Sequence, residues 1–189
     1  MSAHRNLLSI AFAVLLSSSA AAQPSPELIQ QMIGQWDVQQ RMWPGPKAAA
    51  VDLPAASAKR QLVGDTCVEE VMESAGGAGQ SDHFVRRALL NYNAVSRRYE
   101  YTSFDTRGPQ LMTEIGAPTG PKATADGLHL DGSTFVAPQW GNAKNVRFKY
   151  RLVVGRIEQD KQRVALFLTP LSAMPKVEFM AFEYVYTRR

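Results

Sequence analysis

Apolar and polar residues alternate with a period of two along most of the chain. The alternation is clearest at 177–188, a stretch rich in aromatic and β-branched residues that contains no Gly or Pro. Both of its faces are largely apolar, so a strand there must be covered on both sides. A second clean alternation lies near the start, at 36–42. We predict that these two strands pair with each other and close a barrel.

A short helix is predicted just before the first strand. Ser25 suits the N-cap, Pro26 the first helical position and Glu27 the positive end of the helix dipole. Gly34 then ends the helix, because a glycine accepts the backbone conformation in which many helices stop.

Further alternating segments follow, separated mostly by turn-sized gaps. They predict strands at 60–63, 66–73, 84–91, 99–105, 110–115, 128–136, 145–156 and 162–169. The alanine-rich segment 47–58, which contains Pro54, is predicted to be a long mobile loop. A count of about ten strands, one helix and no βαβ rhythm indicate an all-β fold, either an antiparallel up-and-down barrel or a sandwich.

The first 22 residues have the three parts of a secretory signal peptide: a basic start, an apolar run at 7–16 and small residues at 17–22. The apolar run is too short to span a bilayer. We expect cleavage before Gln23, one domain at 23–189, and a periplasmic or secreted protein without a membrane anchor. Cys67 is the single cysteine, so the core must hold the fold without a disulfide.

The formal net charge of +4 comes from basic residues that are scattered along the chain. Arg147, Lys149 and Arg151 alternate with Phe148 and Tyr150. This is the pattern of a solvated outer strand face rather than of a concentrated basic patch. We therefore expect no nucleic-acid partner.

The chain resembles the bacterial family DUF1579 in three segments, which read IGQWDVQQRMW near the mature start, LLNYNAVSRRYEYTSFDT in the middle and FEYVYTR at the end. The resemblance covers nearly all of 23–189. It implies a single calycin-like barrel related in shape to lipocalins and nitrobindin. Its motifs build the barrel, so it implies a fold far more strongly than an activity.

Gly34 and Trp36 form the G-x-W piece that the resemblance shares with calycins at large. It implies that Trp36 plugs one end of the barrel and that Arg188 of the last strand packs across it, with Arg189 as the alternative. A guanidinium over an indole ring is a cation–π contact worth about 1 kcal/mol. We expect a structural role for this group.

Haem is the first cofactor to consider, because nitrobindin-like barrels hold it through one histidine. The mature chain has only His83 and His129, and neither lies on the late strands where the resemblance would place a haem ligand. Neither has a Cys or His partner at a spacing suited to zinc. We expect both to be surface histidines and predict no cofactor and no metal site.

Glu183 lies on an apolar strand face, between Ala181 and Val185. If that face lines the barrel, burial raises the pKa of Glu183 and suits it to acid–base chemistry. In that case Arg86 is the natural inward counter-charge. The alternative is an outward Glu183 paired with Lys or Arg across the strand.

The inward positions of such a barrel form an aromatic wall with a few polar groups, which suits a small apolar or amphipathic molecule with a polar end. The candidate ligand-binding residues are Trp36, Gln40, Arg86, Tyr101, Tyr150 and Glu183. We expect an exported small-ligand-binding barrel, monomeric or homodimeric. The alternatives are an isomerase or hydrolase that uses Glu183 or Asp105, and an interaction protein whose barrel is filled. An enclosed cavity would separate the first two from the third.

Overall fold

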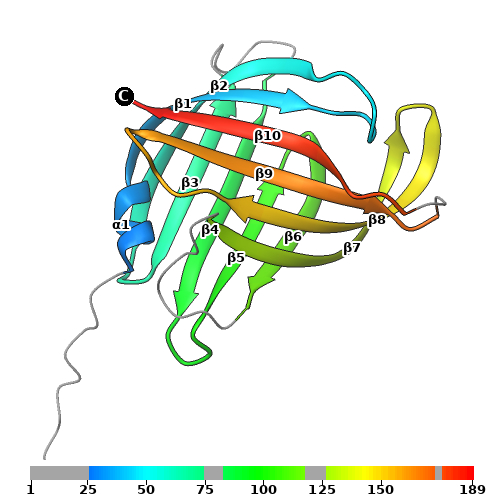
Figure 1. The fold of residues 1–189 in the computed structure, drawn as a ribbon. Helices are drawn as coiled ribbons and strands as arrows, with labels where there is room; N and C mark the ends of the chain where they lie inside the picture. Colours follow the sequence, from blue (N-terminus) through cyan, green and yellow to red (C-terminus); the bar gives the residue numbers. More distant parts are fainter. Residues whose placement is uncertain (1–25, 75–82, 118–126, 173–175) are drawn as a thin grey trace, which may run out of the picture.

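The last strand, β10 (Phe179–Arg188), pairs antiparallel with the first, β1 (Gly34–Met42), and closes the sheet into a barrel in the computed structural model of the protein (Figure 1). The register joins Trp36 to Arg188 and Met42 to Phe182. The structure describes residues 26–74, 83–117, 127–172 and 176–189. The predicted pairing of the closing strand with the first strand is confirmed.

Within these residues, ten strands follow the chain order around the barrel, and each pairs antiparallel with the next. The other eight are β2 (Val51–Val63), β3 (Cys67–Ser74), β4 (Val85–Asn93), β5 (Arg98–Asp105), β6 (Gly108–Gly116), β7 (Leu128–Trp140), β8 (Ala143–Val154) and β9 (Lys161–Pro170). The all-β up-and-down barrel is confirmed, and the sandwich alternative is excluded because the sheet is closed.

The predicted loop at 47–58 is wrong over its second half, where β2 already runs from Val51. Pairing with β1 overrides the weak strand preference of the alanines. The register between β1 and β2 shifts between Val38 and Gln40, opposite Pro54. Proline lacks an N–H group and is tolerated in a sheet at such an irregularity.

Helix α1 (Glu27–Met32) lies at one end of the barrel, just before β1 (Figure 1). Pro26 occupies the N-cap position without a side-chain hydrogen bond. The predicted cap, Ser25, lies outside the described residues. Leu28, Ile29 and Met32 are buried against the barrel, so the helix covers this end with apolar side chains.

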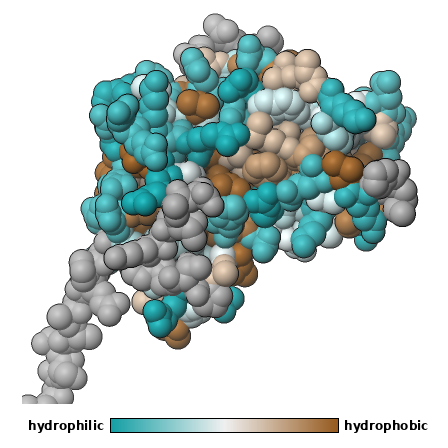
Figure 2. Space-filling model, viewed as in Figure 1, coloured by the Kyte–Doolittle hydropathy of each residue, from teal (hydrophilic) through white to brown (hydrophobic). Residues whose placement is uncertain are grey.

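The buried apolar side chains of the described residues form two clusters. The larger one surrounds Trp36 and Tyr99 and includes the buried side chains of α1. The second surrounds Phe148, and it receives Trp140 from the end of the long β7–β8 hairpin. The Nε1 atom of Trp140 donates a hydrogen bond of 2.8 Å to the Pro44 carbonyl, which ties this hairpin to the segment after β1. Outside, hydrophilic side chains cover most of the face shown in Figure 2.

Candidate functional site

Charged side chains from β2, β3 and β4 meet inside the barrel. Glu70 accepts hydrogen bonds from Arg60 Nε at 2.7 Å and from Arg86 Nη1 at 2.6 Å. Arg60 lies directly opposite Glu70 in the β2–β3 register, while Arg86 comes from the neighbouring strand β4. All three side chains are buried. We call Arg60, Glu70 and Arg86 the interior ion network.

The charge state of the network follows from its geometry. Burial alone would raise the pKa of the Glu70 carboxyl, but Arg60 and Arg86 lower it below its ordinary value. Glu70 is therefore ionised at neutral pH. Because both guanidinium groups are always protonated, the network carries two positive charges and one negative charge.

Neutral side chains complete the hydrogen bonds of the network. Tyr186 donates to Glu70 Oε1 at 3.3 Å, and Arg60 Nη1 donates to Gln162 Oε1 at 2.5 Å. Arg86 Nη2 donates to the Tyr101 hydroxyl oxygen. The Arg60 guanidinium also lies over the Tyr186 ring, 3.9 Å from its centroid. These contacts offset part of the cost of burying three charges.

A second buried carboxylate, Glu114 of β6, lies beside this network. It faces Tyr101 on β5 and Gly132 on β7. Glu114 is 1% exposed, and its Oε2 atom has no hydrogen-bond partner among the described residues. Burial raises the pKa of Glu114 to about 7, although Arg86 acts in the opposite direction. This carboxyl can therefore gain or lose a proton near neutral pH.

Tyr184 of β10 brings a polar atom to the same part of the interior. Its ring lies 5.4 Å from the Arg86 guanidinium. Burial raises the pKa of the Tyr184 hydroxyl, although Arg86 lowers it, so the hydroxyl stays protonated at neutral pH. It makes no hydrogen bond with another described residue. Among the described residues this hydroxyl therefore has no hydrogen-bond partner, and its ring lies beside Arg86.

A small cavity adjoins the interior ion network. Its lining includes Arg60, Glu70, Tyr101 and Tyr186, together with apolar side chains such as Leu90. Its volume of about 10 Å³ leaves room for roughly one water molecule. In this conformation side chains fill this part of the barrel.

Arg107 holds the turn between β5 and β6 against β1. Its guanidinium bonds to Asp105, with a closest distance of 2.7 Å, and lies 3.6 Å from the centroid of the Phe84 ring. It also donates twice, at 3.3 Å, to Oε1 of Gln40. Gln40 in turn donates to the Pro54 carbonyl at 2.7 Å. Both the oxygen and the nitrogen of the buried Gln40 amide thus bond to protein groups.

The pairing between β6 and β7 is short, and a side chain continues the barrel wall where the backbone hydrogen bonds end. The backbone register pairs β6 with β7 from Glu114 to Gly116. One residue before this register, the Tyr150 hydroxyl takes the place of a strand partner, because it donates to the Thr113 carbonyl at 3.0 Å and accepts from the Thr113 N–H at 3.2 Å. A Cβ atom at Gly132 would overlap the Tyr150 ring, so this glycine makes room for the tyrosine. Glu114 lies where the backbone ladder ends.

Residues 21–188 match the model of a family described as protein of unknown function, DUF1579. That match spans most of the chain. The chain belongs to the DUF1579 family. No curated protein matches it.

The G-x-W piece and the closing arginine of this DUF1579 protein meet at the α1 end of the barrel. The Arg188 guanidinium lies 4.2 Å from the centroid of the Trp36 indole, which is the contact that the resemblance to calycins implies. Arg188 also donates to the carbonyls of Ile33 at 2.7 Å and Gln31 at 2.6 Å. A Cβ atom at Gly34 would lie 2.7 Å from Arg188 Nη1, and Gly34 has a φ of 140°. The group fixes the helix to the barrel.

The ion pair between Arg86 and Glu183 that we considered from strand parity is not formed. Glu183 is buried on the outer side of the wall, where Arg163 Nε donates to its Oε1 atom. Arg41 Nη2 forms an ion pair with Glu183 Oε2 at 2.5 Å. The partner of Arg86 is Glu70 instead.

A bulge in β10 explains why the alternation of side chains gave the wrong direction for Glu183. The register with β9 shifts between Met180 and Phe182, which inserts one extra residue. Because side chains alternate with a period of two, one extra residue moves all later side chains to the opposite face. Tyr184 and Tyr186 therefore point inward and Glu183 outward.

The other predicted ligand-binding residues, Trp36, Gln40, Arg86, Tyr101 and Tyr150, are all buried. His83 and His129 are exposed, as expected of surface histidines. Over the described ranges, no three His, Cys, Asp or Glu side chains gather as a metal site would require. The same part of the chain holds no helix long and apolar enough to cross a membrane.

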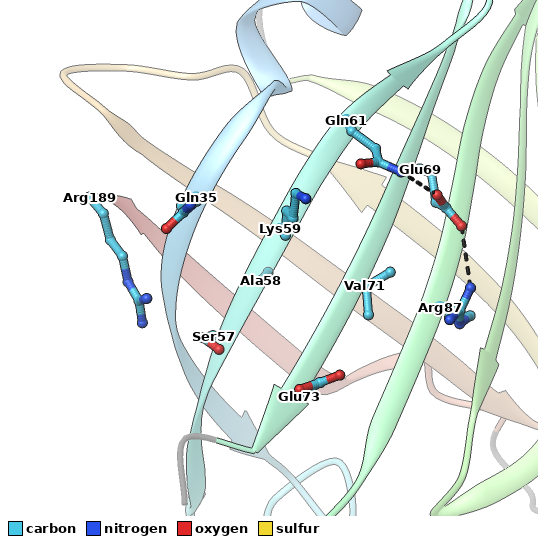
Figure 3. A pocket seen from close by; sticks show the side chains of 10 residues that line it. All are labelled: Gln35, Ser57, Ala58, Lys59, Gln61, Glu69, Val71, Glu73, Arg87 and Arg189. Carbon is cyan, nitrogen blue, oxygen red and sulfur yellow. Dashed lines mark hydrogen bonds and ion pairs between the residues drawn. The ribbon is translucent and has the colours of Figure 1, made fainter. Parts of the chain in front are cut away.

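A larger hollow, of about 500 Å³, lies on the outer face of β1 to β4 (Figure 3). Its side chains are mostly polar and several bond to one another: Gln61 donates to Glu69 at 2.9 Å, and Arg87 lies 3.5 Å from Glu69. Figure 3 shows these three side chains joined in a row across the strands. Such a face is satisfied by water and by its own ion pairs, so it does not require a ligand.

Sequence reasoning missed Glu70 and Glu114, the two carboxylates that the described part of the chain places inside the barrel. Glu70 shares a strand face with Val68 and Met72, and Glu114 shares one with Met112. A glutamate on the same strand face as apolar residues can indicate a buried carboxylate, but many exposed glutamates show this pattern as well. The interior tyrosines on β10 were also missed, because the bulge conceals their direction.

Proposed function

We propose that this DUF1579 protein is an exported binding protein that holds a small amphipathic ligand inside its barrel, with the polar end of the ligand at Arg86, Tyr184 and Glu114. The proposal rests on the family's barrel fold and on a buried carboxylate oxygen, Glu114 Oε2, that has no hydrogen-bond partner among the described residues. The signal-like pattern at 1–22 supports export.

The observation that carries the proposal is the Oε2 atom of Glu114, which is buried and has no hydrogen-bond partner among the described residues. An unsatisfied buried polar atom costs about 1–3 kcal/mol of folding free energy. A ligand that supplies the missing hydrogen bond would recover this free energy on binding. Tyr184, whose hydroxyl bonds to no other described residue, offers a second contact.

The residues around Glu114 suit the two ends of an amphipathic molecule. Tyr101 lies opposite Glu114 and bonds to Arg86, so it orients the polar end. The aromatic cluster of Phe135, Trp140, Phe148, Phe179 and Phe182 provides an apolar region for the other end. We do not assign Gln40 and Trp36 to the ligand. Gln40 bonds to Arg107 and to Pro54, and Trp36 packs against Arg188 at the α1 end of the barrel.

A ligand larger than a water molecule reaches this site only when side chains move, because the cavity beside the network is about 10 Å³. The wall beside Glu114 is the natural route. There, two hydrogen bonds of one tyrosine hydroxyl to Thr113 replace the backbone ladder. Side-chain rotation can break these bonds without unpairing any strand.

The small cavity favours one other function, an interaction protein whose barrel is filled. In that case a buried water would satisfy Glu114, and partners would bind the outside.

An acid–base enzyme, the other alternative, would use Glu114, whose pKa of about 7 suits proton transfer, rather than the outward Glu183 or the Arg107-bound Asp105.

Native mass spectrometry of the protein purified from its own host tests the proposal. We expect a bound small molecule in the wild type and its loss in Glu114→Leu, which has no polar atom to bond to the ligand. Glu158→Leu is the matched control, because Glu158 is exposed in a turn and should leave the bound molecule in place. N-terminal sequencing of the same sample should give Gln23 as the first residue if the protein is exported.

Absence of any bound molecule would count against the proposal. If, in addition, no compound of a mixed library of anionic, neutral and cationic small molecules raised the melting temperature, the filled-barrel function would replace it.

A further inference from the structure

The charges in the barrel interior do not balance when Glu114 is protonated. Among the described residues, the charged side chains buried inside the barrel are Arg60, Glu70, Arg86 and Glu114. Two arginines and one ionised Glu70 leave one positive charge in excess. The ion pair of Asp105 and Arg107, at the turn between β5 and β6, adds no net charge.

An uncompensated buried charge is unfavourable, and a protein can offset it in two ways. Glu114 can ionise, which leaves a second buried carboxylate without a hydrogen bond on Oε2. Alternatively, an anion can enter while Glu114 keeps its proton. The anion then supplies the missing negative charge and accepts the hydrogen bond that protonated Glu114 can donate.

Three groups converge on the place where such an anion would lie. Arg86 contributes its charge, since only two of its donors, Nη1 and Nη2, are engaged, with Glu70 and Tyr101. Tyr184 contributes a hydroxyl that no other described residue binds, on a ring whose centroid lies 5.4 Å from the Arg86 guanidinium. The third group is the Glu114 carboxyl, whose Oε2 atom has no hydrogen-bond partner among the described residues and which lies opposite Tyr101, the residue that Arg86 binds.

We infer that the ligand is a small carboxylate whose charged group lies between Arg86, Tyr184 and Glu114 and binds together with a proton on Glu114. This inference rests on the proposed function and names its ligand class. It involves no covalent step. The proton comes from solvent when Glu114 is ionised in the free protein.

The groups that face Glu114 determine how binding depends on pH. They are Arg86 from β4, Tyr101 from β5 and Tyr150 from β8, while β7 presents Gly132. Burial raises the pKa of Tyr101 and of Tyr150, so neither titrates near neutral pH. The arginine does not titrate in this range. Glu114 is thus the group of this set that changes charge between pH 6 and pH 8.

The test uses hexanoate with two probes of the same chain length, 1-hexanol and hexylamine, and measures each dissociation constant by calorimetry. We expect hexanoate to bind most tightly and its dissociation constant to rise about tenfold from pH 6 to pH 8, because a group with a pKa of about 7 loses its proton over that range. Hexanoate itself stays ionised throughout.

Two variants make the test specific. Glu114→Gln stays neutral and keeps an N–H donor, so it should bind hexanoate with a dissociation constant that no longer changes with pH. Glu158→Gln, exposed in a turn, should behave as the wild type. Circular dichroism confirms that each variant is folded.

Three results would overturn the inference: equal or tighter binding of 1-hexanol or hexylamine, no binding of hexanoate, or an unchanged pH dependence in Glu114→Gln. A neutral or cationic molecule found in the protein from its host would overturn the inference and leave the proposed function intact. If neither host material nor the probes give a bound species, both fail.

Discussion

Replacement of Glu70 by glutamine should strongly destabilise the barrel. Glu70 accepts from Arg60 at 2.7 Å and from Arg86 at 2.6 Å, and all three side chains are buried. Glutamine has the same shape but no charge, and its amide N–H₂ group must face a guanidinium. Removal of one partner from a buried ion pair costs about 3–5 kcal/mol. We expect a loss near the middle of this range, about 4 kcal/mol.

The neighbouring residue provides the control. Glu69 lies on the same strand but on the outer face, where it bonds to Gln61 at 2.9 Å and lies 3.5 Å from Arg87. An exposed pair of this kind contributes about 0–1 kcal/mol, so Glu69→Gln should have little effect. Urea unfolding of both variants at pH 7 measures the free energies of unfolding.

A double-mutant cycle with Arg60→Met tests whether the loss comes from charge. The double variant should lose less free energy than the sum of the single variants, because fewer buried charges are left without a partner. If Glu70→Gln unfolded within 1 kcal/mol of Glu69→Gln, or if the two substitutions were additive, the interior ion network would not be the stabilising unit described above.

The network also predicts a pH dependence. The pKa of Glu70 is lowered in the folded protein from its ordinary 4.5, because Arg60 and Arg86 outweigh the effect of burial. Its contribution to stability is therefore complete above pH 4.5 and is lost as the pH falls through the folded pKa. Glu70→Gln should remove this part of the acid sensitivity.

Further predictions concern single residues of the interior. Because the pKa of Glu114 rises from 4.5 unfolded to about 7 folded, the wild type should lose up to about 3 kcal/mol as the pH rises from 4.5 to 7, and urea melts of Glu114→Gln should lack this loss. Trp36→Ala should cost roughly 3–5 kcal/mol, whereas Trp43→Ala, at a partly exposed site, should cost much less; equal costs would contradict the role of Trp36. Gly132→Ala should destabilise by about 1–3 kcal/mol because its methyl group would overlap the Tyr150 ring, and a neutral effect would show that the ring can move aside. Purified protein should show no Soret absorbance and gain none with haemin; a sharp Soret band would refute this.

Local sequence determined much of the architecture. The two-residue alternation located most strands, and the fully apolar closing stretch predicted its pairing with the first strand. Side-chain direction within an uninterrupted strand depends only on the residue's position, so Trp36, Arg86 and Tyr101 were placed correctly as interior residues. The 47–58 segment was misjudged because strand formation there depends on pairing with β1 rather than on composition.

Only the tertiary structure decided which polar side chains meet. Glu69 and Glu70 are neighbours of the same type, but side chains alternate between the two faces of β3. Glu69 therefore points to solvent, whereas Glu70 points to two arginines that lie 10 and 16 residues away in the chain. Contacts between strands depend on register, and register is a property of pairs of segments. A single bulge after Met180 therefore turned Glu183 outward and brought Tyr184 to Arg86, which no periodicity within one strand could reveal.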